Sequence, residues 1–295
     1  MTGGGHSDSA GGICHYQRNM DGALPRSALW RFGAIVFPVK LFKRLSLPAL
    51  LLTAISLPAF SAPESGLQRT GAFNMTATLE QLLGEASAEV QSVIARDEQI
   101  DWEVYVPKNY NPDLPAGVMV FVSPGNKGDL PAGWAGVMED HNLIWVSANK
   151  SGNDVPVVNR MLKAIYGLEA VRQLYSIDDS RIYVAGFSGG GKVASRIANN
   201  FATTFAGGVF ICGSHTWGET KSENVEAIKS NRYVFLTGEF DQALEPTKRA
   251  YRSYRAVDVP NIKLVVVRGM GHSNPPGHEL KKAIQFLETG ENEPI

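Results

Sequence analysis

A serine, a carboxylate and a histidine follow three apolar runs of this 295-residue chain, in that order along the sequence. The serine is Ser188, which follows the run at 181–186 within the pattern Gly186-Phe187-Ser188-Gly189-Gly190. Glycines on both sides let a strand and a helix pass close to a strained turn that exposes the serine hydroxyl. Asp241 follows the run at 233–236, and His272 follows the run at 262–267. A histidine can take the proton of a serine hydroxyl, and a carboxylate fixes the tautomer of that histidine, so these residues predict nucleophilic acyl transfer through Ser188.

The acid of this set has two candidates, because Glu239 lies in the same loop as Asp241. Only one of the two carboxylates can face His272. We favour Asp241, since a carboxylate a few residues past the end of a strand has room to turn back toward the histidine. Glu239 stays open as the alternative.

Acyl transfer also needs backbone N–H donors directed at the oxyanion that develops on the substrate. The amide of Gly189, directly after the nucleophile, is expected to be one donor. A second is expected in the loop after the apolar run at 117–122, where Asn126 is our candidate and Gly125 the alternative. Four further loop side chains are candidates for contact with a substrate: Trp134, Asn153, His215 and Trp217. The alternative for the two tryptophans is that they only cover the edge of the sheet.

The glycines around Ser188 also fit a second pattern. Gly186, Gly191 and Lys192 match Gly-x-x-x-x-Gly-Lys, which cradles phosphates when a serine or threonine follows to bind Mg²⁺. Residue 193 is valine, so a nucleotide site is disfavoured. A glycine-rich turn around a serine without a chemical role is the other alternative.

Composition and charge exclude several classes of protein. The formal net charge is −1 with both signs interspersed, so the sequence has no electrostatic footprint for nucleic acid. The two cysteines, Cys14 and Cys212, do not make a disulfide framework, and the six histidines lack the spacing of metal ligands. We therefore expect no metal and no cofactor.

Strands and helices are predicted to alternate over about two hundred residues. Short apolar runs predict strands at 89–94, 100–106, 117–122, 143–146, 181–186, 207–212, 233–236 and 262–267. Helices are predicted at 76–88, 156–175, 189–200, 223–229, 244–256 and 277–288. This alternation is typical of an α/β domain whose mostly parallel sheet carries helices on both faces. In such sheets, functional groups lie on loops at the carboxyl ends of strands, where Ser188, Asp241 and His272 all fall.

The N-terminal part of the sequence predicts export. Residues 1–38 lack periodicity and are interpreted as disordered or as not part of the natural product. Residues 39–61 have the charged, apolar and small-residue regions of a signal peptide, with cleavage near Ala62. Their apolar stretch is short and interrupted by proline, so we expect no stable membrane insertion after cleavage. The remaining chain is divided into an N-terminal extension at 62–88 and a catalytic domain at 89–295, in the periplasm or outside the cell.

Three stretches resemble a known superfamily: Gly186-Phe187-Ser188-Gly189-Gly190, Gly238-Glu239-Phe240-Asp241 and Gly269-Met270-Gly271-His272. Over about residues 89–290 the chain resembles the α/β hydrolases, and most of all the exported esterases grouped with polyhydroxybutyrate depolymerases and feruloyl esterases. The resemblance implies hydrolysis of carboxylic esters through an acyl-serine intermediate, without a cofactor. Members of this group usually carry His-Gly in the oxyanion loop, where this chain has Ser123-Pro124-Gly125.

Three classes of function compete, and we favour an ester hydrolase. A serine peptidase or acyl transferase on the same fold is the alternative, and a non-catalytic binding protein is the third. In this fold a lid is most often inserted between the positions of Cys212 and Tyr233, which only about twenty residues separate. We therefore expect no large cap domain and an open cleft that accepts small-molecule or polymeric esters with short-chain or aromatic acyl groups.

Overall fold

The computed structural model describes residues 68–219 and 224–291, all within the compact unit Ala54–Ile295. The predicted leader at 1–38, the predicted signal peptide at 39–61 and the cleavage site near Ala62 lie outside these residues. Within the described part of the chain, no helix combines the length and apolar composition that crossing a membrane requires.

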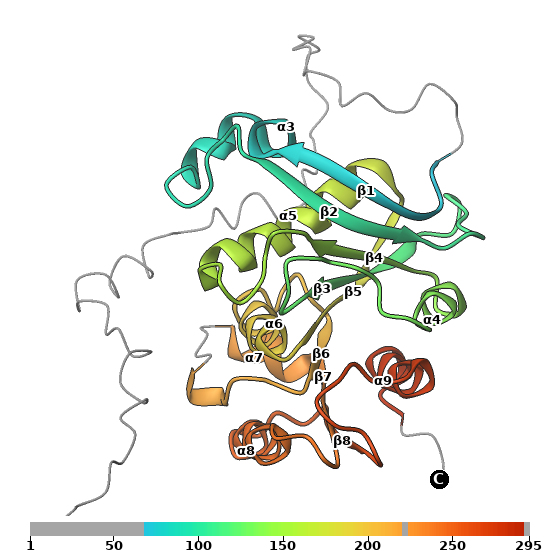
Figure 1. The fold of residues 1–295 in the computed structure, drawn as a ribbon, viewed down its shortest axis with the longest axis vertical. Helices are drawn as coiled ribbons and strands as arrows, with labels where there is room; N and C mark the ends of the chain where they lie inside the picture. Colours follow the sequence, from blue (N-terminus) through green and yellow to red (C-terminus); the bar gives the residue numbers. More distant parts are fainter. Residues whose placement is uncertain (1–67, 220–223, 292–295) are drawn as a thin grey trace, which may run out of the picture. The chain divides into compact units, whose positions relative to one another are not determined.

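The described residues form one eight-stranded sheet in the order β1-β2-β4-β3-β5-β6-β7-β8 (Figure 1). Its strands are β1 (Gly71–Thr78), β2 (Gln99–Val106), β3 (Ala116–Val122), β4 (Leu143–Ala148), β5 (Ile177–Phe187), β6 (Gly207–Ile211), β7 (Arg232–Gly238) and β8 (Ile262–Val267). Neighbouring strands from β4 through β3 to β8 are all parallel, whereas β1 pairs with β2, and β2 with β4, in antiparallel register. The prediction of a mostly parallel sheet is confirmed, and the carboxyl ends of β3 to β8 lie at one edge.

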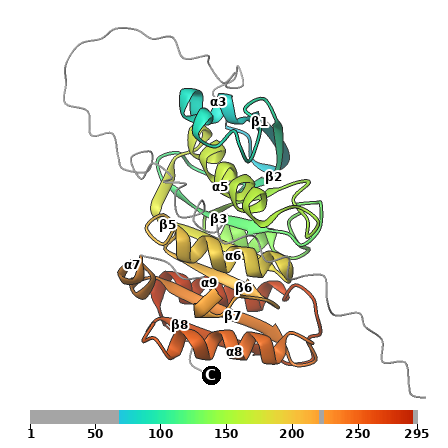
Figure 2. The same cartoon turned by 90° about the vertical axis from the view of Figure 1, so that its left-hand side faces the viewer.

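Helices cover both faces of this sheet, as predicted. On one face, at the right of Figure 1, lie α4 (Ala135–Asp140) and α9 (Gly277–Thr289). The other face, turned toward the viewer in Figure 2, carries α5 (Val157–Leu174), α6 (Gly189–Asn200) and α8 (Leu244–Arg255). The shorter helical segments are α3 (Leu79–Leu83), η1 (Gly84–Glu89), η2 (Trp217–Glu219) and α7 (Val225–Ser230). Between β6 and β7 the described residues hold only η2 and α7, so this connection contributes no cap domain.

The central strands are apolar because helices bury them from both sides. Every residue of β3, β4 and β6 is buried, as expected for parallel strands inside a layered domain. The edge strand β1 instead alternates, with Phe73, Met75 and Ala77 buried and the residues between them exposed. The closely packed centre holds the strand ends, and therefore the loops that follow them, in fixed positions.

The start of the described fold differs from the sequence prediction. The helix predicted at 76–88 begins only at Leu79, because residues 71–78 form β1 and pair with β2 along the full length of the strand. The segment interpreted as an extension at 62–88 therefore contributes an edge strand to the same sheet.

The strand predicted at 89–94 is wrong. Residues 90–94 form turns after η1, and Val90 and Ile94 bury their side chains without joining the sheet. The antiparallel partner of β2 at this edge is β1, which lies earlier in the chain.

Candidate active site

Ser188 lies at the sharp turn between β5 and α6. Its backbone has φ 55° and ψ −120°, a conformation that costs a non-glycine residue about 1–3 kcal/mol and persists where the surrounding structure enforces it. The Ser188 N–H donates to the carbonyl oxygen of Ile211 on β6 at 2.8 Å. A Cβ atom at Gly186 would collide with the carbonyl of Gly190, and one at Gly190 would collide with the carbonyl of Val122. Only glycine fits at both positions, which explains the pattern around the serine.

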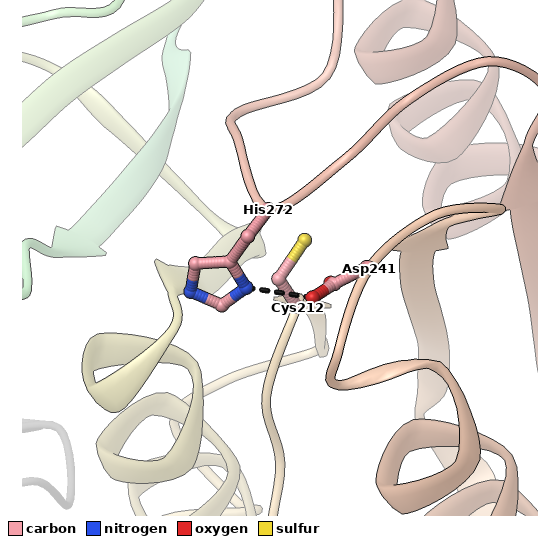
Figure 3. Close-up of side chains that lie close together, drawn as sticks. All are labelled: Cys212, Asp241 and His272. Atoms are coloured by element: carbon pink, nitrogen blue, oxygen red, sulfur yellow. Dashed lines mark hydrogen bonds and ion pairs between the residues drawn. The ribbon is translucent and has the colours of Figure 1, made fainter.

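The structure brings His272 and Asp241 to Ser188. The Nε2 atom of His272 lies 2.9 Å from Ser188 Oγ, and its Nδ1 atom lies 2.7 Å from Asp241 Oδ1 (Figure 3). An ionised carboxylate can only accept, so Nδ1 carries the proton and Nε2 can accept the proton of the serine hydroxyl. The side chain of His272 is 31% exposed, whereas that of Asp241 is fully buried. The imidazole is therefore partly accessible to solvent, and the buried carboxylate of Asp241 holds it in place.

Three hydrogen-bond donors contact the Asp241 carboxylate. The Thr237 hydroxyl donates to Oδ2 and the Ala243 N–H donates to Oδ1, both at 2.8 Å. The third donor is Nδ1 of His272. The Cys212 thiol lies beside the carboxylate and donates to the carbonyl oxygen of Ser273 at 3.5 Å. Burial raises the pKa of Asp241, but the neighbouring Cys212 thiol and these hydrogen bonds outweigh burial and hold this pKa below its ordinary value. Asp241 is therefore ionised at neutral pH.

Glu239, the alternative acid, is bonded elsewhere. Its Oε2 atom accepts from the N–H of Gly269 at 2.9 Å, and the residue is exposed. Of the two carboxylates in this loop, Asp241 is the one that contacts His272.

Cys212 lies beside the carboxylate and the imidazole in Figure 3. Burial and then the neighbouring Asp241 raise the pKa of the Cys212 thiol to about 12, so it stays protonated at neutral pH. Among the described residues, Cys212, Asp241 and His272 form a group whose possible metal-ligand atoms lie within 4.8 Å of one another. A cysteine binds a metal as the thiolate, whereas Cys212 is protonated at neutral pH. The Nδ1 atom of His272 is already bonded to Asp241. These side chains therefore fit a hydrogen-bonded network better than a metal site.

Trp134 is a core residue, so the prediction that it contacts a substrate is wrong. Its ring is fully buried and packs edge-to-face against Phe121 and Trp145. Its Nε1 atom donates to the carbonyl oxygen of Pro275 at 2.9 Å. Pro275 belongs to the same loop as His272, so the tryptophan supports this loop from within the core.

His215 and Trp217 follow β6 and are partly buried. The N–H of His215 donates to Ser195 Oγ on α6 at 3.1 Å, and Trp217 packs edge-to-face against Tyr254 of α8. Burial, and to a smaller degree the charge of Arg196, lowers the pKa of His215. These contacts anchor the loop to two helices, and a substrate contact by His215 or Trp217 stays a prediction.

The loop after β3 is tied to the loop after β4. The N–H of Gly125 donates to Ser123 Oγ at 3.1 Å. Asn126 accepts from Lys150 N–H on its carbonyl oxygen at 2.8 Å, and from Gly152 N–H on Oδ1 at 2.9 Å. Within residues 68–219 and 224–291, no hydrogen bond uses the Asn126 N–H.

Arg160 of α5 is a buried cation in this region that sequence reasoning missed. It is 3% exposed and donates to three acceptors on the two loops. Its Nε binds the carbonyl of Ser151 at 2.9 Å, Nη1 binds Asn153 Oδ1 at 3.1 Å, and Nη2 binds the carbonyl of Ser123 at 2.8 Å. A signal for it exists, because position 160 lies on the apolar face of its helix, where an arginine is buried only with partners.

Three residues in contact with Asp241 or His272 were also missed. Thr237 donates to the carboxylate, Cys212 lies beside it, and the ring of Phe187 lies against that of His272 with centroids 5.0 Å apart. All three stand at or directly beyond the carboxyl end of a strand, and this position is the signal that could have identified them.

Comparisons with known proteins agree with this architecture. The model of the prolyl oligopeptidase family, peptidase family S9, matches residues 158–294. A search of the curated proteins gave no match. Among solved structures, the chain is similar to the feruloyl esterase module from Clostridium thermocellum complexed with sinapinate, with 14% identity and a TM-score of 0.57 over 76% of this chain and 90% of that chain.

Two further structures are similar at comparable levels. An S-formylglutathione hydrolase from Staphylococcus aureus matches with 11% identity and a TM-score of 0.53, over 74% of this chain and 99% of that one. The acylaminoacyl peptidase of Pyrococcus horikoshii matches with 15% identity and a TM-score of 0.50, over 68% of this chain and 41% of that one.

At these identities the structural similarities show the fold, which is that of the α/β hydrolases. The family match covers residues 158–294, somewhat less than half of the chain, and lies within this fold. The fold expected from the sequence motifs is thereby confirmed.

Proposed function

We propose that the protein hydrolyses carboxylic esters through an acyl-serine intermediate on Ser188. The observation that carries the proposal is the unbroken chain of hydrogen bonds from Ser188 Oγ through the His272 ring to the ionised Asp241. Ser188 also stands at the N-terminus of α6, where the first N–H groups have no partner within the helix and favour negative charge. The three side chains suit attack of Ser188 Oγ on an acyl carbon. The N–H groups of α6 suit stabilisation of the negative charge that then develops on the acyl oxygen.

In the acylation step, Ser188 Oγ attacks the ester carbonyl carbon while His272 Nε2 takes the hydroxyl proton. The carbonyl π electrons move to the oxygen, and Asp241 stabilises the imidazolium through Nδ1–H. When the tetrahedral intermediate collapses, the bond to the alcohol oxygen breaks and that oxygen takes the proton from Nε2. The products are the free alcohol and acyl-Ser188.

Deacylation repeats these transfers with water. His272 Nε2 takes a proton from water as the water oxygen attacks the acyl carbon. The second tetrahedral intermediate releases Ser188 Oγ, which recovers the proton from Nε2, and the carboxylic acid leaves. Every proton and electron pair is accounted for by substrate, water and these side chains.

We assign the two backbone oxyanion donors to Gly189 and Asn126. The N–H of Gly189 belongs to the first residue of α6 and therefore has no intrahelical acceptor. Asn126 is supported over Gly125 because the Gly125 N–H already donates to Ser123 Oγ. The two bonds that Asn126 receives from the neighbouring loop hold its backbone still, which favours a preorganised donor.

Ester substrates are favoured by two observations. Among the solved structures that the chain spans to 90% or more are a feruloyl esterase module, at 90% of its length, and an S-formylglutathione hydrolase, at 99%. The short connection between Ile211 and Arg232 supports an open cleft, and hence small-molecule or polymeric esters with short-chain or aromatic acyl groups.

A serine peptidase is the second candidate. It is favoured by the match of residues 158–294 to a peptidase family and by the similarity to an acylaminoacyl peptidase. The same histidine could protonate a leaving amine as readily as a leaving alcohol.

A substrate panel separates the two candidates. Purified protein is assayed with p-nitrophenyl butyrate, with ethyl ferulate as an ester without an activated leaving group, and with blocked and free aminoacyl p-nitroanilides. We expect kcat/KM for ethyl ferulate to exceed that for the best anilide by at least about tenfold. Efficient cleavage of an anilide, with ethyl ferulate left intact, would replace the esterase proposal by the peptidase.

A further inference from the structure

The side chain of Asn153 lies against the residue that follows the nucleophile. A Cβ atom placed on Gly189 would collide with Oδ1 of Asn153, and would stand only 2.7 Å from its Cγ and 2.9 Å from its Nδ2. The amide of Asn153 therefore occupies the space that a side chain at position 189 would fill. Asn153 is nevertheless exposed, so the same amide also borders solvent.

Arg160 determines the orientation of this amide by binding its oxygen atom. The Nη1 atom of Arg160 can only donate, and it binds Oδ1 of Asn153 at 3.1 Å. Oδ1 is thereby bound by a buried cation, and Nδ2 is the atom of the amide that Arg160 leaves without a bond. No hydrogen bond within residues 68–219 and 224–291 uses Nδ2 of Asn153. An unused donor therefore lies beside Gly189, 2.9 Å from the position of a Cβ atom on that residue, and is available to a ligand.

The backbone around Asn153 is held between the two proposed oxyanion donors. Its N–H donates to the carbonyl oxygen of Pro124 at 2.9 Å, in the same loop as Asn126. The preceding residue, Gly152, donates to Asn126 Oδ1 at 2.9 Å. One side of the Asn153 position thus adjoins the loop after β3, and the other adjoins Gly189, the first residue of α6.

We propose that Nδ2 of Asn153 is a third, side-chain donor of the oxyanion hole, and that Arg160 is the positioning residue that orients it. Nδ2 donates to the carbonyl oxygen of the bound ester, and this hydrogen bond strengthens as that oxygen becomes negative in the tetrahedral intermediate. The inference rests on the proposed nucleophilic role of Ser188. It adds a side-chain donor to the two backbone N–H groups of Gly189 and Asn126.

The test compares Asn153→Ala and Asn153→Asp with the wild type in steady-state hydrolysis of p-nitrophenyl butyrate. Loss of one preorganised side-chain donor is expected to lower kcat by about 10²-fold with little change in KM, because the bond acts in the transition state. Asn153→Asp should be at least as damaging, since a carboxylate keeps its contact with Arg160 but repels the oxyanion. The matched control is Asn111→Asp, which adds the same charge in the turn before β3, and whose acid can still accept the N–H bond of Asp113.

A transition-state analogue gives a second readout. An alkyl trifluoromethyl ketone adds to Ser188 Oγ and leaves a hemiketal oxyanion in the same hole. Its inhibition constant should rise in Asn153→Ala by about the factor by which kcat/KM falls. A kcat within threefold of wild type in Asn153→Ala, while Ser188→Ala is inactive, would overturn the inference alone. An active Ser188→Ala would overturn the proposed function and this inference together.

The positioning role of Arg160 is tested by a double-mutant cycle. Arg160→Lys keeps the charge but cannot span the three acceptors, so it should lower kcat in the wild-type background. In the Asn153→Ala background the same change should lower kcat by a smaller factor, because the side chain that it orients is gone. Equal factors in the two backgrounds would contradict an orienting role for Arg160.

Discussion

Replacing Asp241 by asparagine tests the acid of the site without changing its shape. Oδ1 of Asp241 accepts from both Ala243 N–H and His272 Nδ1, whereas Oδ2 faces the Thr237 hydroxyl. The Ala243 N–H is fixed in the backbone and can only donate, whereas the Thr237 hydroxyl can rotate and accept a hydrogen bond from an amide nitrogen. The asparagine introduced in Asp241→Asn should therefore place its oxygen at the Oδ1 position and its nitrogen beside Thr237, so that the histidine keeps its tautomer and loses only the negative charge.

The size of the effect follows from that charge. With Nδ1 and Oδ1 2.7 Å apart, the centres of the imidazolium and the carboxylate are roughly 4 Å apart, which corresponds to about 4 kcal/mol at an effective dielectric constant of about 20. At about 1.36 kcal/mol per tenfold in rate, we expect Asp241→Asn to lower kcat by roughly 10³-fold. The assay is kcat for p-nitrophenyl butyrate at pH 8, with circular dichroism and Tm to verify that the variant is folded.

Glu239→Gln is the matched control, because it removes a carboxylate from the same loop. Glu239 is exposed, and a glutamine oxygen can still accept the Gly269 N–H. We expect its kcat to stay within about threefold of wild type, as is usual for a surface change remote from a special contact. A larger loss in Glu239→Gln than in Asp241→Asn would refute the assignment of the acid.

Three other expectations concern the substrate, acid stability and processing. For p-nitrophenyl butyrate, kcat/KM should be at least about tenfold above that for the palmitate ester, without a rate increase at an oil–water interface; a preference for palmitate would refute the open cleft. Because the pKa of Asp241 is lowered in the folded protein, its ionised form stabilises the fold above the ordinary aspartate pKa, and this stability is lost as the pH falls through the lowered value. The Tm of the wild type should therefore fall more steeply below about pH 4 than that of Asp241→Asn, and equal slopes would contradict the shift. N-terminal sequencing of exported protein should find a start near Ala62, whereas a start that retains residues 39–61 would exclude cleavage there.

The principal residues of the site could be predicted because their signals are local. The glycine spacing around Ser188 reflects steric limits within a single turn. Asp241 and His272 each stand a few residues after an apolar run, and parallel strands bring such loops to one edge. The sequence favours Asp241 but leaves Glu239 open, because both lie in one loop and the path of the backbone decides which carboxylate turns inward.

Trp134 could not be placed because its environment depends on residues distant in sequence. It follows Gly133 in a stretch whose sequence is typical of an exposed loop. In the structure, Phe121 of β3 and Trp145 of β4 pack against its ring. Arg160 is similar, since its three acceptors come from loops that only the folded sheet brings together.

The edge strand of the sheet was predicted at 89–94 rather than at 71–78 because several residues of β1 have weak β propensity. β1 has the alternation of a strand, with Phe73, Met75 and Ala77 buried, but its alanine and asparagine residues have low β propensity and weaken the pattern. The apolar residues of 89–94 gave the stronger signal and yet only cover the turn after η1.

Covalent trapping reports directly whether Ser188 is the nucleophile. The protein is incubated with a fluorophosphonate, and the labelled residue is mapped by mass spectrometry in the wild type, Ser188→Ala and His272→Ala. We predict a single adduct on Ser188, no adduct in Ser188→Ala, and labelling slowed by orders of magnitude in His272→Ala, because the hydroxyl needs the imidazole as its base. An adduct on another serine, accompanied by undiminished ester hydrolysis in Ser188→Ala, would contradict the account.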